Sequence, residues 1–154
     1  DYLKENTALS NSSVMCVAEH HKQGGALHQA IKTLQRHGWS LSAEPAVATG
    51  TALVREGRGP GGVWVGVRAH LDSRGLSREA KSHIQRPEHS GSSTQWAART
   101  LRLKNYDIVV VTAYLATGLG LQDFNVVVMQ EIGVYLKAMD KPFVVMGDFN
   151  MTVE

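Results

Sequence analysis

Hydrophobic and polar residues alternate along the chain in blocks that predict both strands and helices. Continuous apolar runs between polar residues predict buried strands, and runs rich in β-branched residues predict paired ones. The strands expected on these grounds are 14–18, 39–43, 51–55, 63–68 and 143–146, with a hairpin formed by 97–104 and 107–114. The turn of this hairpin would lie at Asn105 and Tyr106.

Two further segments have the period of amphipathic helices. Leu27, Ala30, Ile31 and Leu34 follow the i, i+3, i+4, i+7 spacing of one buried face, and Gly38 suits the position after the helix end. A second helix is predicted over 121–139, before Pro142, with a buried face of Leu121, Phe124, Val128, Ile132, Leu136 and Met139. The order of elements predicts an α+β fold, a mixed sheet with helices packed on one face.

One long segment, 70–95, lacks this periodicity. It is rich in Ser, Arg and His and predicts a variable or disordered loop, since structureless segments of this length are uncommon within compact domains.

Composition narrows the class of protein only slightly. The length of 154 residues suits one globular domain, and a net charge of +2 is too small to indicate nucleic acid by itself. The single cysteine, Cys16, lies in an apolar run and is read as a small buried side chain. The sequence shows no signal peptide and no apolar run of membrane-spanning length, so we expect an intracellular protein, nuclear or cytoplasmic.

Two acidic residues occupy matching places in the pattern. Glu19 follows the strand 14–18, and Asp148 follows the strand 143–146. If these strands run parallel in one sheet, both carboxylates emerge at the edge where α/β sheets bind ligands. Two converging carboxylates form a hard-oxygen site suited to Mg²⁺ or Mn²⁺. The alternative is that each is a turn residue or a helix cap.

The tetrapeptide Gly147-Asp148-Phe149-Asn150 favours the functional interpretation. It places an acid and an amide two residues apart, where both side chains can point to the same side of an extended chain. After a β-rich apolar run it resembles a signature of the endonuclease/exonuclease/phosphatase superfamily, which includes deoxyribonuclease I, abasic-site nucleases and non-LTR retroelement endonucleases. The segments 14–20, 61–68 and 106–114 resemble further strands of that family, in the same order.

The resemblance implies hydrolysis of phosphodiester bonds with Mg²⁺ or Mn²⁺, most directly by an endonuclease acting on DNA. Glu19 would bind the metal and Asp148 would orient and deprotonate the attacking water. Asn150 would hydrogen-bond the scissile phosphate or steady Asp148, and Tyr114 would contact the phosphate. Weaker candidates for contact with a nucleic acid are His20, Arg68 and Trp96.

Other constellations of residues compete with this interpretation. Glu19, His20, His21 and His28 suggest zinc, but adjacent histidines on a strand point to opposite faces and no cysteine pair assists. The segment 22–25 before a helix could cradle phosphate, but it lacks the spacing of a P-loop, and a turn is favoured.

The resemblance also implies that 1–154 is a partial domain. The family's first strand has no counterpart before Val14, and its later Asp and closing Asp–His pair would lie beyond Glu154. We therefore expect roughly the first half of a four-layer α/β/β/α sandwich, without the C-terminal half of its own domain. One sheet would lack its partner layer and expose Val65, Val109 and Val111, and the isolated chain would have little or no activity. Two alternatives stay open: a lipid or nucleotide phosphoesterase of the same superfamily, and a non-catalytic remnant or interaction module.

Overall fold

The computed structural model describes residues 11–46, 61–76, 95–117 and 123–150. The first sheet has the order β1-β3-β2, with both pairs antiparallel, and consists of β1 (Val14–Ala18), β3 (Val63–Arg68) and β2 (Trp39–Glu44). The second has the order β4-β5-β6-β7 and consists of β4 (Ser73–Gly75), β5 (Trp96–Arg102), β6 (Asp107–Tyr114) and β7 (Phe143–Asp148). The two helices are α3 (Gly24–Arg36) and α5 (Asp123–Met139).

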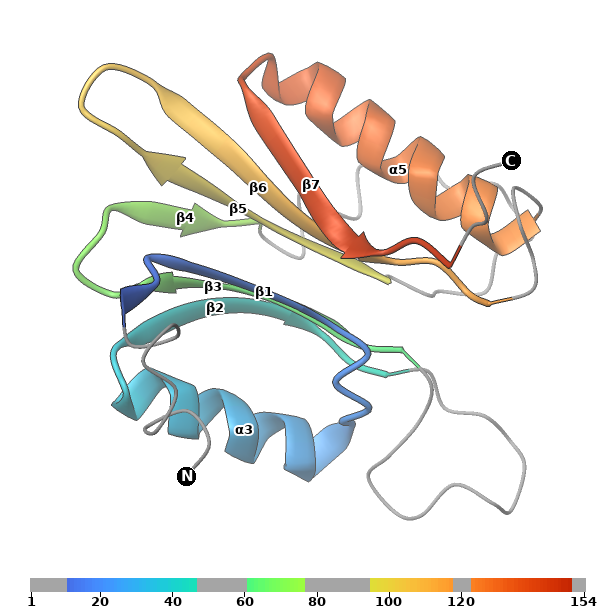
Figure 1. Ribbon diagram of the computed structural model, residues 1–154, viewed down its shortest axis with the longest axis horizontal. Coiled ribbons are helices and arrows are strands. Elements are labelled where there is room, and N and C mark those ends of the chain that lie inside the picture. The colour runs from blue at the N-terminus through green and yellow to red at the C-terminus, as the bar shows by residue number, and fades with distance from the viewer. Residues whose placement is uncertain (1–10, 47–60, 77–94, 118–122, 151–154) are drawn as a thin grey trace.

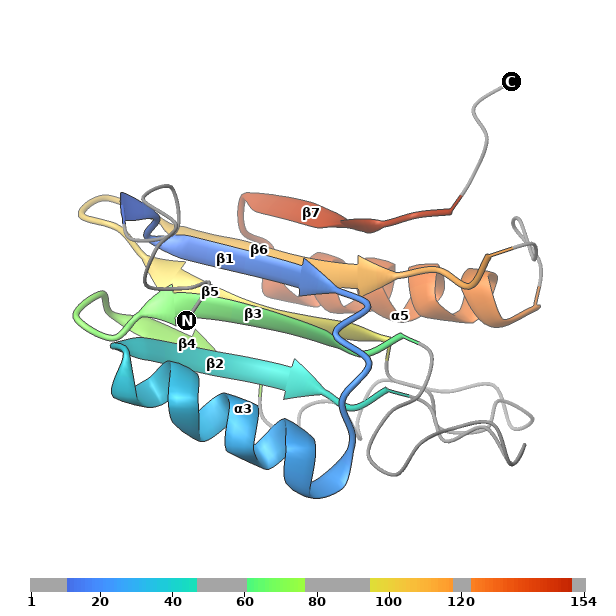
Figure 2. The same ribbon diagram turned by 60° about the horizontal axis from the view of Figure 1, so that its bottom comes forward.

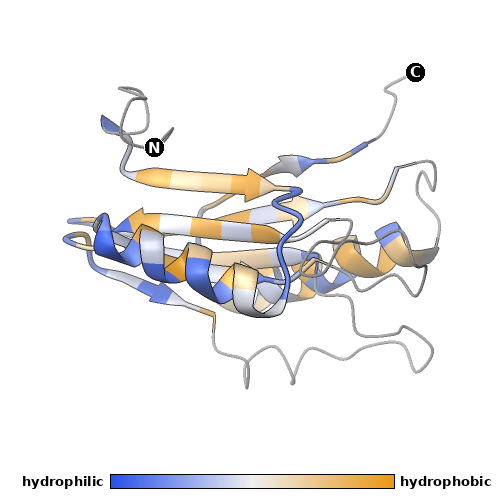
Figure 3. Cartoon of the chain, turned by 90° about the horizontal axis from the view of Figure 1, so that it is seen from below, coloured by the Kyte–Doolittle hydropathy of each residue, from blue (hydrophilic) through white to orange (hydrophobic). Residues whose placement is uncertain are grey.

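These elements stack in four layers, with a helix on each outer face and the two sheets between them (Figure 1). The predicted apolar stripe of α3 buries Leu27 and Leu34 against Met15, Trp39 and Trp64 of the first sheet. The stripe of α5 packs on the second sheet in the same way, through Val128, Ile132 and Leu136. Figure 3 shows the corresponding mixture of hydrophilic and hydrophobic residues along α3.

A third cluster of buried residues joins the sheets to each other. Val63 and Val65 of β3 pack against Ala97 of β5 and against Val110 and Tyr114 of β6. The α+β class is confirmed, but the expectation of a single sheet without its partner layer is wrong, because both sheets are present. Val65 is therefore buried between the sheets, and Val109 and Val111 are buried under α5.

Several exposed apolar residues lie on the last strand of the second sheet. Among the described strands β7 pairs with β6 alone, and it leaves Phe143, Val144 and Met146 exposed, followed by Phe149.

Strand direction brings three strand ends together. β6 and β7 are parallel and are connected through α5, so their carboxyl ends share one edge. β1 lies against β6 and β7 across the interface between the sheets and points the same way, as Figures 1 and 2 show. Glu19 and Asp148 thus lie at the same end of the two packed sheets. The prediction that their strands belong to one sheet is wrong, because β1 and β7 lie in different sheets, but the two strand ends do lie on the same side.

The segment predicted as a loop is partly ordered. Residues 73–75 form β4, which pairs with β5, and Arg102 donates its backbone N–H to Asp72 at 2.9 Å. Three residues without apolar periodicity give no strand signal, so the sequence did not reveal β4. The predicted strand 51–55, Leu121 and most of the predicted loop lie outside the described residues.

Candidate active site at the strand ends

The chain leaves β1 through an unusual backbone turn. Glu19 and His21 have φ values of 56° and 55°, in the left-handed region that non-glycine residues seldom occupy. The backbone N–H groups of His20 and His21 donate to the carbonyls of Gly62 and Gly61, at 3.2 and 3.0 Å. These bonds to the start of β3 hold the turn and therefore fix the position of Glu19.

Gly61 and Gly62 are required for this close approach. Their φ values are 73° and 86°, and a Cβ would collide with the side chain of Gln95 at Gly61 and with the ring of His20 at Gly62. The glycine pair that resembled the family pattern thus permits the turn that carries Glu19.

Gln95 connects this turn to β6. Its side-chain oxygen accepts the N–H of Gly62 at 3.0 Å, and its backbone carbonyl accepts the N–H of Tyr114 at 2.9 Å. The residue is 1% exposed. Sequence reasoning missed Gln95 because it stands at the end of the segment predicted as a loop, where no motif distinguishes it.

Tyr114, the last residue of β6, places its hydroxyl beside Glu19. Burial raises the pKa of Tyr114, and the hydrogen bond and charge of Glu19 raise it further, as does the charge of Asp148; a hydrogen bond with Thr117 opposes the shift. The phenol is therefore protonated at neutral pH and can donate a hydrogen bond. Tyr114 thus links Glu19, its hydrogen-bond partner, to Asp148, its register partner on β7, and we refer to these three residues as the cluster.

Asp148 and Asn150 are held by the strand pairing. Asp148 is the register partner of Tyr114, and its backbone carbonyl accepts the N–H of Leu115 at 2.9 Å. The backbone N–H of Asn150 donates to Oδ1 of Asp148 at 3.2 Å, and the Asn150 side chain donates to the Leu115 carbonyl at 2.8 Å. Asn150 has a φ of 44°, in the left-handed region, which asparagine adopts more readily than most residues.

The loop after β6 is anchored in turn by α5. Asn125 is completely buried in the first turns of this helix. Its side chain accepts the N–H of Ala116 at 2.7 Å and donates to the Ala116 carbonyl at 3.0 Å. These two hydrogen bonds fix the backbone next to Leu115. Leu115 in turn donates its N–H to the Asp148 carbonyl and accepts the side-chain N–H of Asn150.

Both ring nitrogens of His20 form hydrogen bonds within the protein. Its Nε2–H donates to the Glu44 carbonyl at 3.0 Å, and its Nδ1 accepts the N–H of Lys22 at 3.0 Å. The ring also stacks on Trp64, with centroids 4.6 Å apart, and burial lowers the pKa of His20. The imidazole is therefore neutral, with both nitrogens used to position the turn next to Glu19.

Arg68 and Trp96 do not join the cluster. Arg68 lies at the opposite end of β3, where its side chain donates to the Ser12 and His37 carbonyls and packs over the Trp39 ring. Trp96 starts β5 near the cluster, but it is 1% exposed under α5 and its indole N–H donates to Glu131 at 2.9 Å. Trp96 therefore presents no ring face for stacking on a substrate, and Arg68 lies away from the carboxylates.

The cluster offers oxygen donors, the kind that Mg²⁺ and Mn²⁺ prefer. Within the described ranges, Asp, Glu, His and Cys side chains nowhere gather in a group of three or more that could hold a metal ion. A cation bound by Glu19 with Asp148 nearby would have to complete its coordination with water or substrate oxygens, as Mg²⁺ commonly does.

Known proteins resemble this chain in structure only. No protein-family model matches the sequence, and no curated protein matches it. The human Nocturnin catalytic domain, solved with a bound sulfate anion, superposes with a TM-score of 0.63 at 16% identity over 94% of this chain and 54% of its own. ANGEL2, described as a 2',3'-cyclic phosphatase and solved with adenosine-2',3'-vanadate, gives 0.55 at 16% identity over 98% of this chain and 43% of its own.

An endonuclease/exonuclease/phosphatase family protein from Leptotrichia buccalis gives a TM-score of 0.53 at 15% identity, over 94% of this chain and 58% of its own. The chain therefore has the fold of the endonuclease/exonuclease/phosphatase superfamily. It spans about half the length of the structures that it matches.

Proposed function

We propose that this chain is part of a divalent-metal-dependent phosphodiesterase, most directly an endonuclease acting on DNA. The observation that carries the proposal is the cluster of Glu19, Tyr114 and Asp148, assembled from the ends of β1, β6 and β7 in two different sheets. Two carboxylates beside one phenol provide negative charge and oxygen ligands, which a divalent cation would balance.

Each residue has a part in the proposed reaction. The N–H of Asn150 occupies Oδ1 of Asp148, and Oδ2 has no hydrogen-bond partner among the described residues. Asp148 can therefore take a proton from the attacking water through Oδ2, while the water oxygen bonds to phosphorus and the ester P–O bond breaks. Tyr114 stays protonated, and its single O–H, which hydrogen-bonds with Glu19 in this structure, would turn to a phosphate oxygen, while Glu19 would hold the cation. When bound, Mg²⁺ or Mn²⁺ would polarise a phosphate oxygen and stabilise the charge on the leaving oxygen.

A nucleotide-containing substrate is supported by one structural relative, the ANGEL2 protein solved with adenosine-2',3'-vanadate. The mild net charge of +2 is compatible with a polyanionic substrate, and DNA is the first to test. In the part of the chain that the structure describes, no helix is both long and apolar enough to cross a membrane.

The test is nicking of supercoiled plasmid with Mg²⁺ or Mn²⁺ by wild type, Asp148→Ala and the control Asp140→Asn. Asp140 is an exposed carboxylate with a φ of 47°, which Asn tolerates, and it lies at the other end of β7. Since little or no activity is expected of the isolated chain, we expect at most slow nicking. Any such nicking should be abolished by EDTA, reduced about 10²- to 10⁴-fold in Asp148→Ala and unchanged in Asp140→Asn.

Metal-dependent nicking that survives in Asp148→Ala would contradict the proposed role of this carboxylate. If DNA is not cleaved but a phosphoinositide or a nucleotide is hydrolysed with the same dependence on Asp148, the proposed substrate is wrong. The proposed hydrolytic reaction would then stand. If wild type neither binds a divalent cation nor hydrolyses any of these substrates, a non-catalytic module is the better description.

A further inference from the structure

A second concave site lies at the other end of the second sheet. It is a pocket of about 660 Å³ between the C-terminal half of α5 and the ends of β4, β5 and β6. Along β6, Asp107 lines this pocket and Tyr114 lies in the carboxylate cluster, seven residues and therefore roughly 23 Å apart in an extended strand. The pocket is thus separate from the proposed catalytic site.

The floor and one wall of the pocket are apolar. They are formed by Leu76 next to β4 and by Val134, Tyr135, Ala138 and Met139 on α5. Val134 is 54% exposed, although a hydrophobic residue on a helix that covers a sheet is usually buried. Its exposure, together with that of Ala138, leaves apolar surface open to a ligand.

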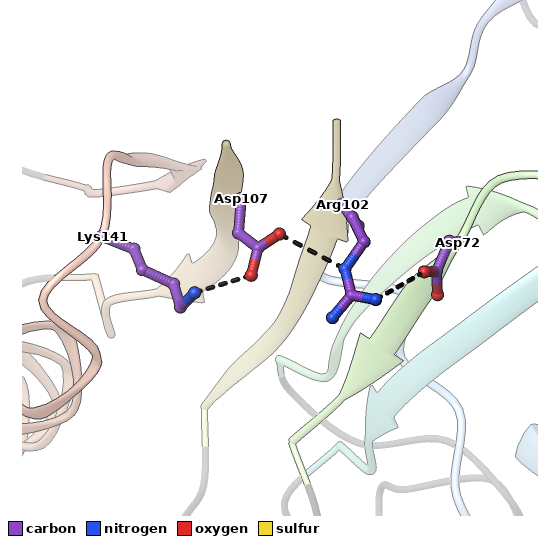
Figure 4. A network of polar contacts seen from close by, with 4 residues as sticks. All are labelled: Asp72, Arg102, Asp107 and Lys141. Carbon is purple, nitrogen blue, oxygen red and sulfur yellow. Dashed lines mark hydrogen bonds and ion pairs between the residues drawn. The ribbon is translucent and has the colours of Figure 1, made fainter. Parts of the chain in front are cut away.

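The rim is charged, with a positive surplus. Lys141 donates to Asp107 at 2.6 Å, Arg102 lies 3.7 Å from the other oxygen of Asp107, and Arg102 also contacts Asp72 at 3.4 Å (Figure 4). Both carboxylates are therefore already paired with cations. Arg74, which is exposed, has no ion pair in the part of the chain that the structure describes, so three cationic and two acidic side chains line the pocket.

We propose that this pocket binds a small amphipathic anion, with an apolar body on the floor of α5 and one carboxylate, sulfonate or phosphate group at Arg74 and Arg102. The volume lies within the range of pockets that enclose drug-sized ligands, about 300 to 1,000 Å³. A free cation is disfavoured because Asp72 and Asp107 are neutralised by their partners. A wholly polar ligand is disfavoured because it would leave the apolar floor uncovered.

The test uses 8-anilinonaphthalene-1-sulfonate, an amphipathic anion whose fluorescence rises in an apolar site, titrated into the 154-residue chain without metal. We expect saturable binding at one site. Ala138→Trp places an indole in the pocket without disturbing buried residues, since Ala138 is exposed, and should weaken binding by about tenfold or more. Arg74→Gln should weaken binding about two- to fivefold, and added salt should weaken it in wild type but less in this variant.

Two control variants separate this pocket from other surfaces. Arg36→Gln removes an exposed cation at the end of α3, and Val144→Ser removes an exposed apolar side chain on β7; both should bind the probe like wild type. Octanoate should displace the probe better than octanamide, because the two have the same apolar chain and only octanoate carries the negative charge that the pocket is proposed to bind.

Three results would each overturn the proposal. They are undiminished binding by Ala138→Trp, loss of binding in Val144→Ser, and equal displacement by octanoate and octanamide. Because the assay needs neither metal nor turnover, its outcome is independent of the proposed hydrolysis.

Discussion

At the scale of single residues, the candidate site is defined by strained backbone and by side chains that serve as internal supports. Three of the four non-glycine residues with positive φ in the described ranges, Glu19, His21 and Asn150, lie next to the carboxylates, and such conformations persist only where the surroundings fix them. Glu19 and Asp148 were predicted from the sequence by their places after apolar strands, and Tyr114 and Asn150 through the family resemblance; the roles of all four in catalysis stay predictions. Gln95 and Asn125 could not be predicted, because their hydrogen-bond partners are distant backbone groups.

His20 leads to a prediction at this scale. Its pKa is lowered by burial, so in the pH range below its ordinary value of 6.5 the unfolded chain binds more protons than the folded one. The contribution of neutral His20 to stability is therefore present above pH 6.5 and is lost as the pH falls through the folded-state pKa. We expect the melting temperature of wild type to fall over this range, and that of His20→Gln to fall less.

The control for this experiment is His28→Gln, an exposed position on α3. It should retain the wild-type pH dependence, since the substitution leaves His20 and its hydrogen-bond partners in place. An unchanged slope in His20→Gln would contradict the assignment of a neutral, hydrogen-bonded ring.

At the scale of elements, most strands and both helices could be predicted because their apolar periodicity reports which face is buried. β4 could not be predicted, because its three residues are two polar residues and a glycine and carry no apolar periodicity. Gly147 has a role that apolar periodicity does not report: in β7 the glycine lets the strand backbone approach β6. A Cβ at Gly147 would overlap the carbonyl oxygen of Ala113, which is backbone and cannot turn away.

Gly147→Ala should therefore push β7 away from β6. We expect a loss of about 1 to 3 kcal/mol in the free energy of unfolding, measured by urea denaturation, together with weaker metal binding as Asp148 moves. The matched control is Gly133→Ala on α5, where a Cβ meets nothing within 4 Å. That variant should gain about 0.5 to 1 kcal/mol, since Ala favours the helix. Equal stability of Gly147→Ala and wild type would contradict the close β6–β7 approach.

At the scale of the whole molecule, the site exists only because two sheets meet. Glu19 comes from the first sheet and Asp148 from the second, and the packing of Val63 and Val65 against Ala97, Val110 and Tyr114 aligns their ends. This pairing of sheets was not predicted, because apolar alternation shows that a strand face is buried but does not show which layer buries it. The site therefore requires both sheets to be packed against each other.

The most direct test of this account is a calorimetric titration with Mn²⁺ of wild type, Glu19→Gln, Asp148→Asn and the control Asp140→Asn. The account predicts one bound cation in wild type and a loss of affinity of about tenfold or more in Glu19→Gln, since this residue is the proposed ligand. A smaller loss is expected in Asp148→Asn, which removes only a neighbouring charge, and none in Asp140→Asn. If Glu19→Gln binds Mn²⁺ as tightly as wild type, the strand-end cluster is not a metal site, and the proposed phosphodiesterase chemistry loses its basis.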